Sequence, residues 1–286
     1  SLDLDLNDLR STTEASSRSV KKVLIDDFTG LDCPYCGWAS FAVSDMLDEY
    51  PETLISAQWH LSAFTPDSSD FDDCINTVDE ESDCFVFRAE LYGWDTINAI
   101  PIEAVNGVSV FNGAASEQSA YDTYLPAYEN NVGQYTPYDI QINGYLDSND
   151  VQYEVTVTLD SNYSNQNMQI HAFVVEDNIM SVWWIFGDVN NYARNVVRII
   201  NLTDDIDINQ MGESQTFSGS FELNTNAWDS DNLKIVSVVQ NSATSEIFQA
   251  HQININNFDI DDDGILSSED NCPNAFNPNQ EDIDND

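Results

Sequence analysis

The sequence predicts an α/β domain, then an all-β sandwich, then an irregular tail that a metal ion would have to order. In residues 21–134, runs typical of buried strands alternate with segments of helical periodicity. Residues 135–257 show short strand patterns without helices between them, and residues 258–286 are rich in Asp and Asn with almost nothing to bury. Residues 1–20 are polar and rich in Ser and Thr, so we expect a flexible leader there.

The charge balance excludes some partners and favours others. Against 51 acidic residues the chain of 286 has only 8 Lys and Arg, which gives a formal net charge of −43. Such a field repels nucleic acid and anionic membranes and attracts divalent cations. It is also typical of proteins adapted to salty water, where ions screen the self-repulsion. No apolar run is long enough to cross a bilayer, so we expect no transmembrane segment.

The first half of the α/β domain has the order strand, helix, strand. Residues 22–28 (KVLIDDF) form a run typical of a buried strand. Residues 37–50 carry apolar side chains three and four positions apart, which predicts a helix that ends before Pro51. Residues 54–61 (LISAQWHL) predict a second strand.

The second half adds two helices and a hairpin. Residues 84–92 predict a short helix after an acidic, loop-like stretch, and residues 116–130 predict a longer one. Between the helices, residues 102–105 and 108–111 are expected to form a hairpin, because the Asn106-Gly107 pair that joins them tolerates a positive φ.

The sandwich is predicted from short strands at regular spacing. Residues 152–159 alternate cleanly, with one apolar face made of Tyr153, Val155, Val157 and Leu159. Six further strand candidates follow at residues 170–175, 182–185, 195–200, 215–223, 233–239 and 246–250. Such strands without intervening helices are typical of a β-sandwich. We assign the Trp183-Trp184 pair to its core rather than to a ligand groove.

A Cys-Pro-Tyr-Cys motif at residues 33–36 lies between the first strand and the first helix. The first turn of a helix offers unpaired N–H groups and the positive end of the helix dipole, and both stabilise a thiolate on Cys33. Cys36 is placed to close a disulfide with it. Half of a zinc site has the same spacing, but no second Cys-x-x-Cys and no paired His follow, so the pattern favours thiol chemistry.

This order of strand, Cys-x-x-Cys and helix, with a later proline before a hairpin, resembles the thioredoxin fold. The Cys-Pro-Tyr-Cys sequence is similar to the glutaredoxin version of its motif. The resemblance implies that Asp27, six positions before Cys33, is a buried acid that assists proton transfer. It also implies that Pro101 is the cis-proline that lies against the disulfide.

A narrower resemblance covers roughly residues 20–255. The run VLIDDFTGLDCPYC at residues 23–36, with NLKIVSVVQN and EIFQA later in the chain, is similar to the Omp28-related outer-membrane proteins of Bacteroidota-type bacteria. The similarity extends to Gly-Glu-Ser at residues 212–214 and to Trp228. It implies an extracellular location, or one on the outer surface of a Gram-negative bacterium.

Two classes of function stay open, and with them whether the protein is an enzyme. In the first it is a thiol–disulfide oxidoreductase, in which Cys33 attacks and Cys36 resolves. Asp27 would then accept and return the proton during the exchange, and Pro101 would present the substrate backbone. In the second, the disulfide is permanent. The protein is then a non-enzymatic surface, adhesion or assembly protein that uses the thioredoxin fold only as a scaffold. Asp32 beside Cys33 favours the second, since a nearby carboxylate raises the pKa of a thiol.

The other paired cysteines indicate an oxidising compartment. Cys74 and Cys84 are separated by nine residues and are expected to form a disulfide that closes the loop between them. Closing such a loop stabilises a fold by about 2–3 kcal/mol. Two such pairs are typical of proteins outside the reducing cytosol. The alternative is that Cys74 and Cys84 form a resolving pair that relays electrons to Cys33.

The tail carries ligands at the spacing of an EF-hand-like calcium loop. Positions 1, 3, 5, 7, 9 and 12 of that loop would be Asp259, Asp261, Asp263, Ile265, Ser267 and Asp270. Gly264 stands at position 6, where the sharp turn needs glycine, and position 7 contributes its backbone carbonyl. The same spacing restarts at Asp282, Asp284 and Asp286. The sequence therefore predicts Ca²⁺ as a bound cofactor.

The pattern DxDxDG…DNCP…NPxQxDxDxD resembles a truncated thrombospondin type 3 repeat. It departs at Ser267, where the repeat usually has Asp, and its second loop lacks a position 12. The resemblance implies that Cys272 pairs with a neighbouring repeat, so we expect the natural protein to continue past Asp286. Proteins of this kind often carry further repeats and a sorting domain for type IX secretion. The expected partners are calcium, other surface proteins or further copies of the chain.

Overall fold

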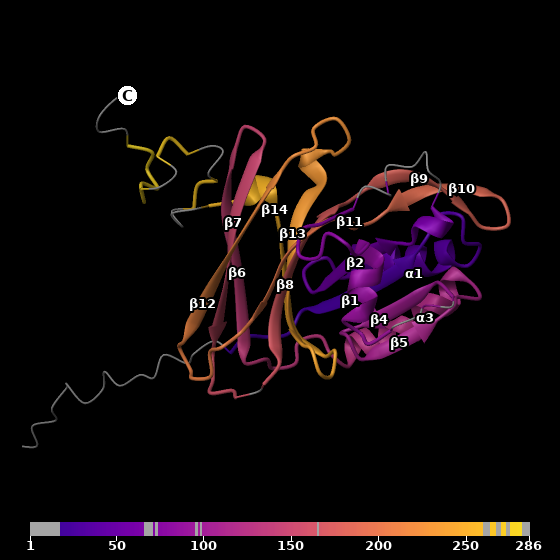
Figure 1. Cartoon of the computed structure of the whole chain (residues 1–286), viewed down its shortest axis with the longest axis horizontal. Helices are drawn as coiled ribbons and strands as arrows, with labels where there is room; N and C mark the ends of the chain where they lie inside the picture. The colour runs from indigo at the N-terminus through magenta and orange to yellow at the C-terminus, as the bar shows by residue number, and fades with distance from the viewer. Residues whose placement is uncertain are drawn as a thin grey trace, which may run out of the picture.

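The computed structural model describes residues 18–65, 71, 74–94, 97, 99–164, 166–259, 264–266, 270–272 and 275–281. Figure 1 shows a helix-covered sheet on one side, a sandwich beside it, and the tail at the far end of the sandwich. The predicted leader up to residue 17 lies outside the described residues. So do six of the predicted calcium ligands, which are Asp261, Asp263, Ser267, Asp282, Asp284 and Asp286.

Strands from both halves of the chain form one nine-stranded sheet. Its order is β14-β13-β8-β11-β2-β1-β4-β5, and β3 also pairs with β11. The N-terminal strands are β1 (Val23–Thr29), β2 (Leu54–His60), β3 (Ile75–Asn76), β4 (Ile102–Val105) and β5 (Ser109–Asn112). The C-terminal strands are β8 (Met168–Glu176), β11 (Val196–Asp205), β13 (Leu233–Asn241) and β14 (Ile247–Asn254). Strands on both sides of the predicted boundary at residues 134 and 135 therefore share a sheet.

Strand β1 is the centre of the N-terminal part of this sheet. It runs parallel to β2 and antiparallel to β4. Strands β4 and β5 form the hairpin that the sequence predicts, and Asn106 and Gly107 at its turn both have positive φ. All seven residues of β1 are buried. They are buried on both sides because helices cover both faces of the sheet at this point.

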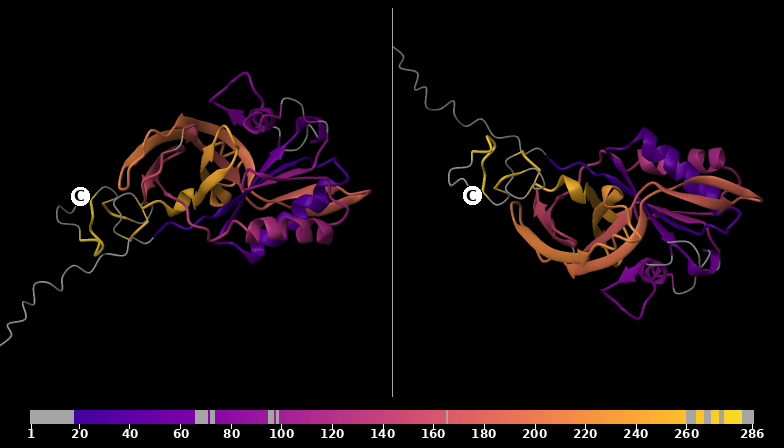
Figure 2. Two further views of the ribbon diagram at one scale, coloured as in Figure 1. Left: turned by 90° about the horizontal axis from the view of Figure 1, so that it is seen from below. Right: turned by 90° about the horizontal axis from the view of Figure 1, so that it is seen from above.

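Two helices cover one face of the sheet and a third covers the other, as Figure 2 shows. Helices α1 (Cys36–Glu49) and α3 (Glu117–Glu129) pack on Val23 and Ile25. Helix α2 (Cys84–Glu90) packs on Leu24 and Phe28 of the opposite face. The three predicted helices are thereby confirmed. Short 3-10 turns are η1 (Ser62–Phe64), η2 (Ser230–Asn232) and η3 (Ile255–Asn257).

The C-terminal strands of the large sheet face a separate three-stranded sheet, and together they form a sandwich. The second sheet has the order β12-β7-β6, with β6 (Tyr138–Asp147), β7 (Asp150–Leu159) and β12 (Ser214–Glu222). Side chains of β7 alternate between buried and exposed as predicted, and the buried ones join a core shared with β8 and β13. Strand β6 was not predicted, although Tyr138, Ile140 and Ile142 point into the same core.

Strands β9 (Ile179–Trp184) and β10 (Asp188–Ala193) form a separate hairpin, which Figure 1 shows near α1 and away from the tail. Trp183, which the sequence assigns to the sandwich core, packs edge-on against Phe41 of α1 instead, with ring centroids 5.6 Å apart. That prediction was wrong because a short apolar segment does not reveal which distant surface it will meet.

The two expected disulfides are present. One joins Cys33 to Cys36, and the other joins Cys74 to Cys84 at the first residue of α2. Cys272 belongs to neither bond. Within the part of the chain that the structure describes, no helix is long and apolar enough to cross a membrane.

Candidate functional site

The Cys33–Cys36 disulfide lies at the N-terminus of α1. Cys36 is the first residue of the helix, and its N–H donates to the carbonyl of Cys33 over 3.1 Å. The Cys33 sulfur lies 3.6 Å from the carbonyl oxygen of Ile100, and the peptide bond between Ile100 and Pro101 is cis. The fold thus brings the cis bond between Ile100 and Pro101 next to Cys33, although the two segments are far apart in the sequence.

Asp27 lies on the face of β1 that α1 covers, and it is fully buried. Its Oδ2 accepts hydrogen bonds from the Ser40 hydroxyl over 2.7 Å and from the Gln58 amide over 3.1 Å. Its Oδ1 is buried and has no hydrogen-bond partner. Burial raises the pKa of Asp27 to about 7, against the lowering effect of these two hydrogen bonds. Ser40 is four residues after Cys36, so the acid is bonded to α1 at a residue one helical turn after that cysteine.

A second buried acid, Glu103, was missed by the sequence analysis. It is the direct partner of Asp27 across the β1–β4 pair, and it is also fully buried. Its Oε2 accepts a 2.8 Å hydrogen bond from the Tyr124 hydroxyl of α3, while its Oε1 is buried without a partner. Burial, and then the nearby charge of Asp27, raise the pKa of Glu103 well above its ordinary value.

The β9–β10 hairpin covers the disulfide. The Trp184 N–H donates to the carbonyl of Leu31 over 2.8 Å, and Trp183 is packed with both cysteines in one apolar cluster. The fit is tight, because a Cβ placed on Gly37 would lie only 2.5 Å from Cδ1 of Ile185. With this hairpin, Leu31, Phe41 and Phe71 packed around them, Cys33 is only 3% exposed and Cys36 is fully buried. A reactant can meet the Cys33 sulfur only when part of this cover moves.

His60 lies near this site but cannot supply a positive charge to it. Burial, assisted by the charge of Arg198, lowers the pKa of His60 to about 3. The ring is therefore neutral near pH 7. Its Nε2 lies 3.4 Å from the amide oxygen of Gln58, the residue whose nitrogen donates to Asp27.

The start of the tail is attached to the sandwich at Asn143 of β6. The side chain of Asn143 accepts from the Asp259 N–H and donates to the Asp259 carbonyl. Asp259 then folds back on its own loop, because its Oδ2 accepts a 3.0 Å hydrogen bond from the N–H of Gly264. Gly264 has φ +88°, a value that glycine adopts without strain. Oδ1 of Asp259 is buried and has no hydrogen-bond partner.

The residues of the DNC and NPxQ motifs contact one another. Oδ1 of Asp270 accepts from the Cys272 N–H over 2.9 Å and from the Gln280 amide over 2.8 Å. Asn271 bonds Gln280 through its backbone N–H and its side chain, and it accepts from Asn277. These contacts give a physical reason for the spacing of the motif. Oδ2 of Asp270 is buried without a partner, as Oδ1 of Asp259 is.

In the described part of the predicted calcium loop, Oδ1 of Asp259 and Oδ2 of Asp270 are thus buried oxygens of the kind that a cation coordinates. Ile265 lies in the described part of this loop, while Asp261, Asp263 and Ser267 do not. Among the described residues alone, no three carboxylate, Cys or His side chains are grouped for a metal. The donors present fit a hard, oxygen-seeking ion.

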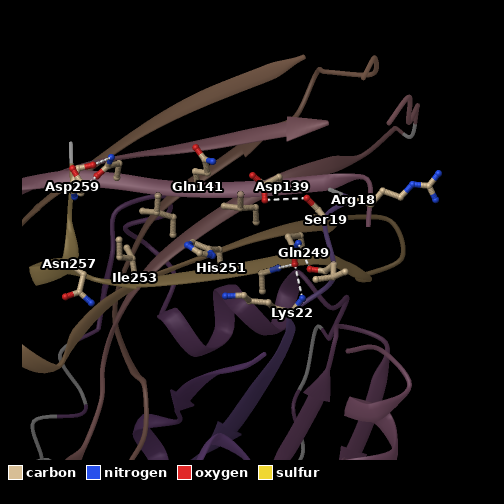
Figure 3. A pocket seen from close by; sticks show the side chains of 15 residues that line it. Arg18, Ser19, Lys22, Asp139, Gln141, Gln249, His251, Ile253, Asn257 and Asp259 are labelled. Atoms are coloured by element: carbon tan, nitrogen blue, oxygen red, sulfur yellow. Dashed lines mark hydrogen bonds between the residues drawn. The ribbon is translucent and has the colours of Figure 1, made fainter. Parts of the chain in front are cut away.

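A cavity of about 710 Å³ lies away from the disulfide, between strands β6 and β14. Figure 3 shows it with Asp259 at one end and Arg18 at the other. Its lining carries Lys22 and Arg18 as well as Asp139 and Asp259, so it presents charges of both signs. We assign it no chemistry.

Comparison with solved structures identifies a protein with a similar fold. No protein-family profile matches the chain, and no curated protein matches it. A solved structure does match, with a TM-score of 0.62 over 84% of this chain and 76% of the other, at 15% sequence identity. The chain shares its fold with HBP35 of Porphyromonas gingivalis. At this identity the likeness to HBP35 concerns the fold alone.

Two other structures match less well than HBP35. A protein of Agrobacterium tumefaciens has 14% identity and a TM-score of 0.48, over 84% of this chain and 97% of its own. A domain of the outer membrane lipoprotein Omp28 of Porphyromonas gingivalis has 14% identity and a TM-score of 0.28, over 42% of this chain and 88% of its own. These TM-scores are too low to support an argument, whereas the HBP35 match spans both the helix-covered sheet and the sandwich.

Proposed function

We propose that this is a calcium-binding protein of the outer surface of a Gram-negative bacterium, and that its thioredoxin-like Cys33–Cys36 site exchanges disulfides. The observation that supports exchange is Asp27, a buried carboxyl with one unpartnered oxygen that is bonded to Ser40, one helical turn after Cys36. Burying an ionisable group without a charged partner destabilises a fold, and such groups gather where a proton has to move. A permanent disulfide has no need of this acid.

The reaction would begin with the reduced cysteines, and an external dithiol would supply the electrons. The Cys33 thiolate attacks one sulfur of a substrate disulfide, and the other substrate sulfur leaves as a thiolate. Cys36 then gives its proton to the buried acid, and its thiolate attacks the Cys33 sulfur. The Cys33–Cys36 bond forms as the bond to the substrate breaks, and two electrons have passed to the substrate. Pro101, beside Cys33, would present the substrate backbone.

The alternative function is that of a non-enzymatic surface, adhesion or assembly protein with a structural disulfide. Two observations favour it. The Cys33 sulfur lies beneath the β9–β10 hairpin, and the outer side of that hairpin exposes apolar side chains of the kind found at protein contacts. These exposed residues are Met180, Val182, Trp184, Phe186 and Tyr192.

The reduction potential of Cys33–Cys36 distinguishes the two functions. We expect a value between about −120 and −270 mV, the range of exchange catalysts. The measurement uses redox buffers and mass spectrometry of alkylated peptides, with the Cys74–Cys84 bond as an internal structural reference. A value below about −300 mV for Cys33–Cys36 would leave only the scaffold function.

For the tail, we propose that Asp259, Asp261, Asp263 and Asp270 bind one Ca²⁺ with the carbonyl of Ile265 and with Ser267, directly or through water. The unpartnered buried oxygens of Asp259 and Asp270 support this assignment. The ion would supply the positive charge that lets these carboxylates lie close together. Asp282, Asp284 and Asp286 would bind a second ion.

Calorimetry tests the calcium proposal. We expect dissociation constants on the order of 10⁻⁴ to 10⁻³ M, as in other extracellular modules, with magnesium competing poorly. The variant with Asp261→Ala and Asp263→Ala should lose the heat of the first site. A control with Asp147→Ala and Asp150→Ala removes two exposed charges elsewhere and should keep it. Equal heats from the two variants would show that the tail attracts calcium only as diffuse charge.

A further inference from the structure

Asp27 and Glu103 face each other on adjacent strands. They are direct partners in the antiparallel pairing of β1 with β4, so their side chains leave the same face of the sheet. Directly opposed residues place their Cβ atoms about 5 Å apart, within reach for two carboxyl groups. Both side chains are fully buried under α1 and α3.

The hydrogen bonds of the two acids are incomplete in the same way. Each has one oxygen that accepts from neutral side chains and one buried oxygen without a partner. Two ionised carboxylates can only accept, so they could not satisfy each other. One proton changes this, because a protonated carboxyl is a donor that the neighbouring carboxylate can accept.

Among the described residues, no positively charged side chain bonds to either acid. The groups that bond the pair are the Ser40 hydroxyl from α1, the Gln58 amide from β2 and the Tyr124 hydroxyl from α3. His60, behind Gln58, is neutral near pH 7. The buried guanidinium of Arg88 lies with Asp26 on the other face of β1. Two adjacent carboxylates in such a site cannot both ionise near neutral pH.

We propose that Asp27 and Glu103 share a single proton, and that Glu103 is a positioning residue that keeps Asp27 ready to accept the proton of Cys36. The second part rests on the proposed exchange reaction. When Cys36 attacks Cys33, its proton passes to the pair, which carries two protons for a moment and then releases one to solvent. When the disulfide is reduced, the pair takes a proton from solvent and passes it to the Cys36 thiolate, so that both the oxidised and the reduced protein hold one proton and one negative charge on the pair.

Infrared spectroscopy of the oxidised protein tests the shared proton without any need for activity. A protonated buried carboxyl gives its own C=O band, which can be followed from pH 5.5 to 9. We expect the band in the parent protein at pH 7. In Glu103→Gln the remaining acid should lose its proton at a pH at least one unit lower, because the proton is no longer shared. Asp27→Asn should give the reciprocal shift, so that either variant suffices if the other does not fold.

The exposed Glu129 at the end of α3 provides the control, and Glu129→Gln should leave the band unchanged. Absence of the band in the parent at pH 7, or the same titration in Glu103→Gln as in the parent, would overturn the shared proton. The pH–rate profile of disulfide exchange then tests the positioning role. We expect its acid limb to move in Glu103→Gln but not in Glu129→Gln, and an unmoved limb would overturn that role.

The two proposals fail in different ways. A protein with no exchange activity but with the expected infrared titration would contradict the exchange function and leave the shared proton standing. An active protein whose infrared band ignores Glu103→Gln would contradict the shared proton and leave the exchange function standing.

Discussion

Each face of strand β1 carries a buried aspartate, but the partners of the two aspartates differ. Asp26 and Asp27 are neighbours in the chain and both are fully buried. Asp26 meets the Arg88 guanidinium at 2.7 Å, accepts from the Trp59 indole at 2.8 Å and also accepts from the Tyr92 hydroxyl. Asp27 meets a hydroxyl and an amide, and one of its oxygens has no partner.

The comparison separates a structural acid from a reactive one. The negative charge of Asp26 is matched by a buried cation, so its ionised form belongs to the fold. The hydrogen-bond partners of Asp27 are neutral, so burial raises its pKa and the carboxyl can gain and lose a proton near neutral pH. Each face also holds a disulfide, with Cys74–Cys84 beside α2 and Cys33–Cys36 beside α1. The unmatched acid is hydrogen-bonded to Ser40, one helical turn after Cys36.

The largest expected effect is that of Asp26→Asn. It would leave the Arg88 guanidinium buried without a counter-charge, so we expect the free energy of unfolding to fall by about 3–5 kcal/mol. Urea denaturation of the oxidised protein at pH 7 measures it. A loss under about 1 kcal/mol would show that Gln240 and Tyr92 satisfy Arg88 alone, and the contrast between the two faces would disappear.

Removal of the Cys74–Cys84 bond comes next. The double change Cys74→Ser and Cys84→Ser frees a loop whose ends are 10 residues apart, and we expect a loss of about 2–3 kcal/mol. The reduction potential of Cys33–Cys36 should stay unchanged, since the two bonds lie in different cores. A shifted potential would instead support an electron relay between them.

Asp27→Asn should act in the opposite direction to Asp26→Asn and should depend on pH. The folded pKa of Asp27, about 7, lies above the unfolded value of 3.8, so the parent loses stability as the pH rises between these values. The variant avoids that loss. We expect it to match the parent most closely at pH 5 and to exceed it by on the order of 2 kcal/mol at pH 8. Urea denaturation at both pH values measures this, and a constant difference would show that Asp27 does not titrate in this range.

The smallest effect concerns the hairpin that covers the disulfide. Ile185→Ala removes contacts with Gly37, and we expect reduction of Cys33–Cys36 by dithiothreitol to become about fivefold faster. Val182→Ala changes an exposed side chain of the same hairpin and should have no effect. Equal rates in both variants would mean that the thiol reaches the sulfur by another path.

Local patterns predicted much of this site. The strand KVLIDDF, the Cys-Pro-Tyr-Cys turn, the helix after it and the Asn106-Gly107 hairpin each have a signal within a few residues. Strand β10 has no such signal, because Asp188–Ala193 is polar and largely exposed. The hairpin's position over the disulfide could not be predicted, since it depends on contacts between Trp183 and Phe41, far apart in the chain.

Glu103 was missed for a related reason. In the predicted strand IEAV, one glutamate between apolar residues is typical of a strand with one face in water. Here α3 covers that face, and the Tyr124 hydroxyl meets the carboxylate there. The partner of Asp26 was also hidden, because nothing in residues 84–92 shows that Arg88 points inward. Burial of a polar side chain is decided by the element that packs on it.

Gln58 is one of the places where the two halves of the large sheet meet, the other being the pairing of β3 with β11. Strands β2 and β11 are joined at one residue pair, Gln58 with Val196, and the Gln58 N–H donates to the carbonyl of Asn195 over 2.9 Å. The side chain of the same residue accepts from the Arg194 N–H and donates to Asp27. A hinge motion that separates β2 from β11 at Gln58 would also pull the Gln58 amide away from Asp27. The relative orientation of the two halves of the sheet and the proton affinity of Asp27 are therefore coupled.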